Sequence, residues 1–167
     1  MRTNRTLAAL LFLIGGIAFA DPAREGLPFH GTMGDEHDEH PADFTLQALD
    51  GPPVSLSQFL GKKPILLVFW ATWCPECNAA FPKINALHGG PAGEKMQILA
   101  LDYRETREKV AAAVKSRDIR YPVLLDERGR VARAFGVVGI PTYILIGRKG
   151  KVVYRENVLP GDISSYL

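Results

Sequence analysis

The sequence predicts an α/β fold in which helices flank a central mixed sheet. Apolar runs of strand length alternate with helical patterns, and the last two runs form a pair around a turn. The run 65–70, ILLVFW, is too short for most helices and suits a strand buried on both faces. Residues 143–146 and 151–154 flank Gly147-Arg148-Lys149-Gly150 and predict an antiparallel hairpin. Strands alternating with helices and then a closing hairpin indicate a sheet of mixed direction.

The remaining elements follow from the same patterns. Residues 44–46 and 53–55 surround the turn signal Asp50-Gly51-Pro52 and predict a short opening hairpin. A helix is expected from near Cys74 to about residue 87, with a kink at Pro82. The other expected elements are a helical turn at 57–60, a buried strand at 96–101, a helix at 106–115, a short strand within 121–125, a brief helix at 131–135 ended by Gly136, and a final helix capped by Asp162.

Residues 1–20 have the three parts of a secretory signal. Arg2 and Arg5 supply positive charge, residues 7–19 are apolar apart from two glycines, and Ala18-Phe19-Ala20 offers a cleavage site. A bilayer-spanning helix needs about 20 apolar residues, and this run is shorter. We therefore expect a cleaved signal peptide, with an uncleaved membrane anchor as the alternative. By either route the protein is expected to be exported, to the periplasm of a bacterium.

Residues 21–41 show no apolar periodicity and are expected to form a flexible tether before a single domain at 42–167. The cluster Asp35-Glu36-His37-Asp38-Glu39-His40 carries possible zinc or copper ligands, but a flexible segment loses much entropy on forming a site. The net charge of +2 is accounted for by Arg2 and Arg5, so the domain and tether together are neutral. This balance argues against a nucleic-acid partner, which would need a basic face.

The chain has two cysteines, Cys74 and Cys77, at the point where a buried strand meets a helix. A sulfur at a helix N-terminus lies beside unpaired N–H groups that favour its thiolate, the form that attacks disulfides. Cys77 follows nearly one turn later, within reach of a mixed disulfide on the first sulfur. Pro75 suits the first helical turn. We therefore expect Cys74 to be the nucleophile and Cys77 the resolving thiol.

Three other uses of the cysteine pair fit the sequence less well. A disulfide that closes a two-residue loop restrains little chain, so a structural role is weak. A zinc site would want a second ligand pair, and the sequence has no second CxxC and no HxxxH. A peroxidase would need a particular pocket before its cysteine, and Ala71 stands where peroxiredoxins have Thr or Ser. A redox-active pair remains.

The stretch Phe69-Trp70-Ala71-Thr72-Trp73-Cys74-Pro75-Glu76-Cys77, followed by Phe81-Pro82, resembles the thioredoxin superfamily. Within it, the chain is similar to the exported TlpA/ResA-like branch, which includes the cytochrome c maturation reductants. The resemblance covers about residues 42–154, including Gly139-Ile140-Pro141-Thr142. It implies a thioredoxin-like fold with an N-terminal β-hairpin and an α/β insertion around residues 96–125.

The resemblance also implies site residues. Pro141 is expected to be a cis-proline facing the dithiol, which would place the Ile140 backbone where an extended substrate segment pairs with it. Trp73 is expected to shield or contact the disulfide, with a packing role as the alternative. The chain departs from its relatives at Val68 and Ala80, where thioredoxins or many branch members carry an acid.

Glu76, between the cysteines, is the nearest candidate to replace these two carboxylates; a solvated side chain is the alternative. Its negative charge would disfavour the Cys74 thiolate and so the reduced form, which favours a reductant.

These observations predict an exported reductant of disulfides in client proteins, apocytochrome c being one candidate, itself reduced by a membrane-bound thiol donor. The cycle needs no cofactor and no metal. A disulfide oxidase or isomerase is the alternative among redox enzymes. A copper chaperone using Cys74 and Cys77 with His88 or the N-terminal histidines is the alternative from another class. Copper-delivering relatives of this fold, however, have a wider cysteine spacing and a later His.

Overall fold

The computed structural model describes residues 40–167. The expected signal peptide, nearly all of the tether and most of its His- and acid-rich cluster lie outside the described residues. Within 40–167, no helix is both long enough and apolar enough to cross a membrane.

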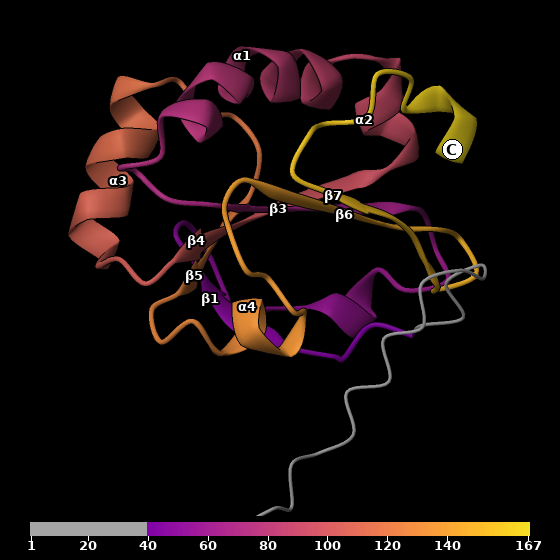
Figure 1. Cartoon of the computed structure of the whole chain (residues 1–167), viewed down its shortest axis with the longest axis horizontal. Coiled ribbons are helices and arrows are strands. Elements are labelled where there is room, and N and C mark those ends of the chain that lie inside the picture. Colours follow the sequence, from indigo (N-terminus) through magenta and orange to yellow (C-terminus); the bar gives the residue numbers. More distant parts are fainter. Residues whose placement is uncertain (1–39) are drawn as a thin grey trace, which may run out of the picture. The chain divides into compact units, whose positions relative to one another are not determined.

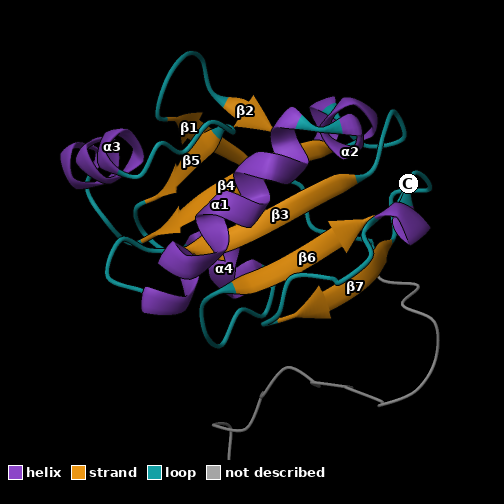
Figure 2. Ribbon diagram, turned by 90° about the horizontal axis from the view of Figure 1, so that it is seen from above, coloured by secondary structure: helices purple, strands orange, loops and turns teal. Residues whose placement is uncertain are grey.

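A seven-stranded mixed sheet forms the centre of the described domain, in the order β2-β1-β5-β4-β3-β6-β7 (Figures 1 and 2). The central pairs β3–β4 and β4–β5 are parallel, and the outer pairs are antiparallel. The strands are β1 (Thr45–Ala48), β2 (Val54–Ser55), β3 (Ile65–Trp70), β4 (Gln97–Tyr103), β5 (Val123–Asp126), β6 (Thr142–Ile146) and β7 (Val152–Glu156). This arrangement confirms the predicted α/β fold with its mixed sheet.

Helices cover both faces of the sheet. Figure 1 shows α1 and α2 above the strands and α4 below them. The helices are α1 (Pro75–Gly89), α2 (Pro91–Lys95), α3 (Arg107–Ser116) and α4 (Arg130–Ala134), with 3-10 turns at Leu56–Gln58 and Ser164–Tyr166. The sequence patterns did not predict α2, and the expected final helix is a single 3-10 turn at which Asp162 accepts the Ser164 N–H at 2.9 Å.

The alternation of side chains along the strands divides the core into two clusters. On β3, Leu66, Val68 and Trp70 pack on the face covered by α1, while the intervening residues pack on the opposite face with α4. All six residues of β3 are buried, which explains its unbroken apolar sequence. The first cluster also contains Cys74 and Cys77, so the dithiol sits on the α1 face of the sheet.

Candidate active site

A disulfide joins Cys74 to Cys77 at the junction of β3 and α1. Cys74 caps the helix in an extended conformation, and its Sγ accepts the N–H of Cys77 at 3.2 Å. Pro75 occupies the first turn, where its missing N–H leaves no hydrogen bond unmade. A sulfur in this position faces the positive end of the helix dipole and an N–H donor, which both favour a thiolate.

Both sulfurs are nearly covered in the disulfide form. Cys74 is 2% exposed and Cys77 is 1% exposed, in a cluster with Trp70 and Phe81, whose rings meet edge to face at 5.1 Å. Trp73, immediately before the disulfide, is by contrast 60% exposed. Trp73 therefore presents its indole to solvent immediately before the covered disulfide.

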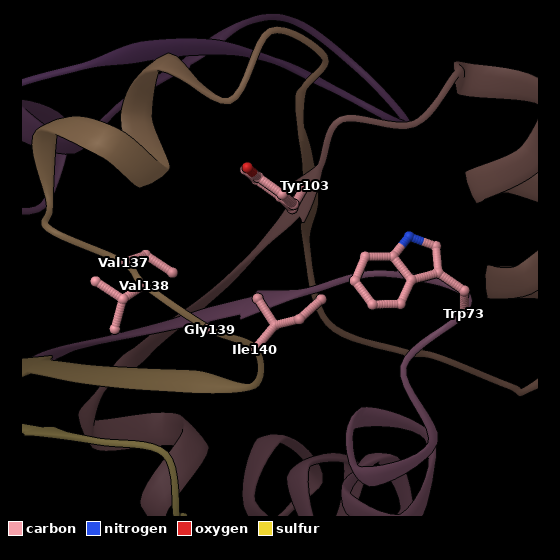
Figure 3. A pocket seen from close by; sticks show the side chains of 6 residues that line it. All are labelled: Trp73, Tyr103, Val137, Val138, Gly139 and Ile140. Carbon is pink, nitrogen blue, oxygen red and sulfur yellow. The ribbon is translucent and has the colours of Figure 1, made fainter.

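An apolar pocket of about 150 Å³ opens beside Trp73, the residue that precedes the disulfide. It is lined by Trp73, Tyr103, Val137, Val138, Gly139 and Ile140. In Figure 3 the Trp73 indole comes from the loop before α1, and Ile140 lies next to it from the loop before β6. Two of the three residues expected to bind substrate thus line one pocket.

The third, Pro141, follows Ile140 through a cis peptide bond, as the family resemblance implied. Hydrogen bonds from both sides fix this loop. Thr142 Oγ1 donates to the carbonyl of Gly139 at 2.6 Å, and Asn157 Nδ2 donates to the carbonyl of Pro141 at 2.6 Å. The first residue of β6 and the residue after β7 therefore hold this loop in place.

The loop that leads into Cys74 is anchored by side chains distant in sequence. Glu105, whose side chain is 3% exposed, accepts from the Thr72 N–H at 2.5 Å and from Thr72 Oγ1 at 2.8 Å. Lys109 Nζ lies 2.5 Å from Glu105 Oε1, and Arg117 donates to the Thr72 carbonyl at 2.9 Å. The loop between β4 and α3, together with α3, thus holds the residues that precede the dithiol.

A second buried acid lies next to Glu105. Asp102, on β4, is fully buried, and burial followed by the nearby Glu105 charge raises its pKa to about 8. For Glu105, burial acts to raise the pKa, but the Lys109 ammonium and the Thr72 donors outweigh it and hold the pKa below its usual value. Two adjacent carboxyls with pKa values displaced in opposite directions are therefore built into the loop's support.

Sequence reasoning missed this pair because the expected strand ended at residue 101, one residue short of Asp102. The sequence did contain a signal for a buried acid. Alternate residues of a strand share one face, and Asp102 continues the inward-facing series of Ile98 and Ala100. Glu76, the acid expected to act near the dithiol, is exposed in the first turn of α1. Its proposed role stays a prediction.

His88, the possible copper ligand, lies in the last turn of α1 and packs against Tyr121, with ring centroids 6.3 Å apart. His88 is eleven positions after Cys77, about 16 Å along the helix at 1.5 Å per residue. The structure therefore does not bring His88 to the dithiol. Among residues 40–167, no three His, Cys, Asp or Glu side chains gather as a possible metal site.

Known proteins resemble the chain in sequence and in structure. The AhpC/TSA family matches residues 38–155. The thiol-disulfide oxidoreductase ResA of Bacillus thuringiensis subsp. konkukian is 33% identical over 156 residues, which cover 92% of this chain and 88% of the relative. A thiol:disulfide interchange protein DsbE from Chlorobium tepidum superposes with a TM-score of 0.67 at 30% identity, over 73% of this chain and 84% of that one.

The sporulation thiol-disulfide oxidoreductase A of Bacillus subtilis is 24% identical and covers 91% of this chain and 88% of its own length. The matches thus extend over the sheet, the dithiol junction and the loop that carries the cis-proline. The chain belongs to the AhpC/TSA family of redoxins and is a thiol–disulfide oxidoreductase with a thioredoxin-like fold, similar to ResA.

Proposed function

We propose that the protein is an exported reductant that delivers two electrons to disulfides of client proteins. The observation that carries this proposal is the position of Cys74 Sγ, which caps α1, accepts the Cys77 N–H at 3.2 Å and is already paired with the Cys77 sulfur. This position supports Cys74 as the sulfur that forms the thiolate and Cys77 as the sulfur that resolves the mixed disulfide.

The cycle begins with the dithiol reduced. The Cys74 thiolate attacks one sulfur of the client disulfide, so that a mixed disulfide forms and the other client sulfur leaves as a thiolate. Cys77, deprotonated, then attacks Cys74 Sγ, which releases the second client thiolate and closes the Cys74–Cys77 disulfide. The client gains two electrons, and a membrane-bound thiol donor returns two electrons to the protein in the same kind of exchange.

The apolar pocket supports a role in holding the client chain. A segment that lies along Ile140 and Pro141 has its cysteine directed to Cys74, while Trp73 covers an adjacent apolar side chain of the client. Aromatic side chains that are exposed before binding and buried afterwards contribute much of the affinity at such contacts. An apocytochrome c, with cysteines in an unfolded segment, fits this description of a client.

The direction of the reaction is inferred from charge. Glu76 lies in the first turn of α1, next to Cys77 and two positions after Cys74, and is exposed. A carboxylate there opposes the thiolate and therefore destabilises the reduced form, whereas a strong oxidant requires a stabilised reduced form. For cellular location, we propose that residues 1–20 direct export. Residues 21–41 then form a tether, which joins the domain to the membrane where the signal stays uncleaved.

The test is to trap clients with Cys77→Ala, which should stall as a covalent adduct, while Cys74→Ala should form none. The dithiol potential of the wild-type protein should lie near that of thioredoxin, about −270 mV, and not near that of DsbA, about −120 mV. An oxidising potential would overturn the reductant proposal and favour an oxidase or isomerase. Adducts on Cys74→Ala but not on Cys77→Ala would reverse the roles of the two sulfurs.

A further inference from the structure

Asp102 is a buried acid that the dithiol cycle does not use. It lies on β4 beside Trp70 of β3, on the face that holds Cys74 and Cys77, and none of its surface is exposed. Neither of its carboxyl oxygens receives a hydrogen bond of normal geometry from the described residues. An ionised carboxyl in such a place would be strongly destabilised, so the neutral form is favoured.

Glu105 is the side chain that faces Asp102, since Glu105 binds Thr72, two residues after the strand partner of Asp102, Trp70. The other contacts of Glu105 are those of an ionised carboxylate. Its two oxygens accept from Thr72 N–H and Thr72 Oγ1 and face the Lys109 ammonium, an arrangement suited to a negative charge. A carboxylate has no hydrogen to give, so a hydrogen bond between the two acids requires the proton to be on Asp102.

The charged groups that face Asp102 agree with this assignment. The Glu105 charge adds to burial in raising the Asp102 pKa, while the Glu105 amide and the more distant Lys109 act in the opposite direction with less effect. The strand neighbours of Asp102, Trp70 on β3 and Leu125 on β5, carry no charge. At neutral pH the site therefore holds one negative charge, on Glu105, and one proton, on Asp102.

We propose that Asp102 is a positioning residue of the dithiol site: its carboxyl O–H donates to Glu105 and keeps that carboxylate in place to hold Thr72, and with it the loop that carries Trp73 and Cys74. The inference depends on the thiol–disulfide chemistry of the dithiol and not on the direction proposed for it. Loss of the proton places two anions side by side in a buried site, and the loop is released from its anchor.

This device gives the reaction an unusual pH profile. Thiol–disulfide exchange normally becomes faster as pH rises, because more of the attacking thiol is ionised. In this protein the ionisation of Asp102 releases the loop and slows the attack, which opposes the gain from thiol ionisation. The rate at which the reduced protein attacks a disulfide should therefore pass through a maximum near pH 8 and fall beyond it.

The experiment measures that rate from pH 6 to 9.5 with bis(2-hydroxyethyl) disulfide, which has no titrating group in this range. Asp102→Asn should match the wild-type rate within about twofold at pH 7, because the amide also donates to Glu105. It should lack the fall above pH 8, because it does not ionise. Asp102→Leu should be slower than the wild type by about tenfold below pH 8, the size expected for the loss of one charge-assisted hydrogen bond, and this difference should shrink above pH 8, where the wild type loses the same bond.

Asp126→Asn serves as the matched control. Asp126 is also buried, on the adjacent strand β5, but it accepts the N–H groups of Arg130 and Ala132 at the start of α4. Its replacement should leave the shape of the pH profile unchanged. The proposal is overturned if Asp102→Asn falls above pH 8 as the wild type does, and this comparison stands even if Asp102→Leu does not fold. An oxidising dithiol potential would overturn the reductant proposal and leave these rate profiles unaffected.

Discussion

The proton assigned to Asp102 has a thermodynamic consequence that unfolding experiments measure without any substrate. The pKa of Asp102 is 3.8 in an ordinary setting and about 8 in the folded protein. A group whose pKa is raised by folding stabilises the native state most below its unfolded pKa, and this stabilisation is lost as pH rises through the folded pKa. Stability linked to Asp102 should therefore fall between pH 4 and pH 8 and stay constant above.

The magnitude follows from linkage. One pKa unit corresponds to about 1.4 kcal/mol, so the contribution changes by up to 4 kcal/mol, roughly, between pH 5 and pH 8. Asp102→Asn cannot titrate and should lose this dependence. The free energy of unfolding of the variant minus that of the wild type should be small at pH 5 and should increase with pH, in favour of the variant. Glu105, whose pKa folding lowers, contributes its own dependence only as pH falls below its usual range, outside this window.

The assay is urea unfolding of the disulfide form at pH 5, 6.5, 8 and 9.5, with the m-value checked for constancy. Asp118→Asn provides a control: Asp118 is exposed beside Arg120, which lowers its pKa, so its replacement should give a difference that is flat across this range. If the difference for Asp102→Asn is also flat, Asp102 is ionised throughout and the shared proton does not exist.

Three further predictions concern the pocket and its supports. Gly129→Ala should lower the free energy of unfolding by about 2–3 kcal/mol, because φ is +62° and a Cβ would lie 2.8 Å from Tyr103 Cε2. Gly61→Ala, at φ +75° with open space, should lower it by only about 1 kcal/mol, so equal losses in thermal unfolding would exclude the clash. Trp73→Ala should lower kcat/KM for a protein client about tenfold, whereas dithiothreitol should reduce the Cys74–Cys77 disulfide of the variant at the wild-type rate or faster. Equal losses in the two reactions would indicate that Trp73 only packs. Asn157→Ala should slow the client reaction without changing the dithiol potential, because it frees the Pro141 carbonyl; an altered potential would contradict this.

Local patterns predicted most of the sheet because its strands are distinctive in composition. The apolar run 65–70 matches β3 at both ends, and the hairpin around Asp50-Gly51-Pro52 forms as β1 and β2. The start of α1 was also predictable, because Pro75 suits the first turn and Cys74 the cap. By contrast, α2 is a five-residue helix with Gly93 inside it, which is too short and too weak in propensity to stand out.

The support of the dithiol loop was not predictable by the same means. Glu105 and Thr72 lie 33 residues apart, and their contact exists because β3 and β4 are neighbours whose ends meet at one edge of the sheet. No local pattern encodes such a contact. The burial of Cys74 is a similar case: the sequence indicates a reactive sulfur, and the packing of Trp70 and Phe81 determines that it is 2% exposed in the disulfide form.

Val68 and Ala80 stand where relatives carry acids, and the buried acids near the dithiol loop come from other elements. Those positions lie on β3 and α1, and an acid at either would add charge on the elements that carry the dithiol. Here the buried acids come instead from β4 and the loop after it, and Lys109 and Thr72 compensate the charge of Glu105. For Asp102 the Glu105 amide and Lys109 do not offset burial and the Glu105 charge, so its carboxyl is mostly neutral at pH 7. The site thus keeps a proton close to the loop of Cys74 without placing an uncompensated anion beside the sulfur, and this combination makes the pH profile of Asp102→Asn a sensitive measurement of how the loop is held.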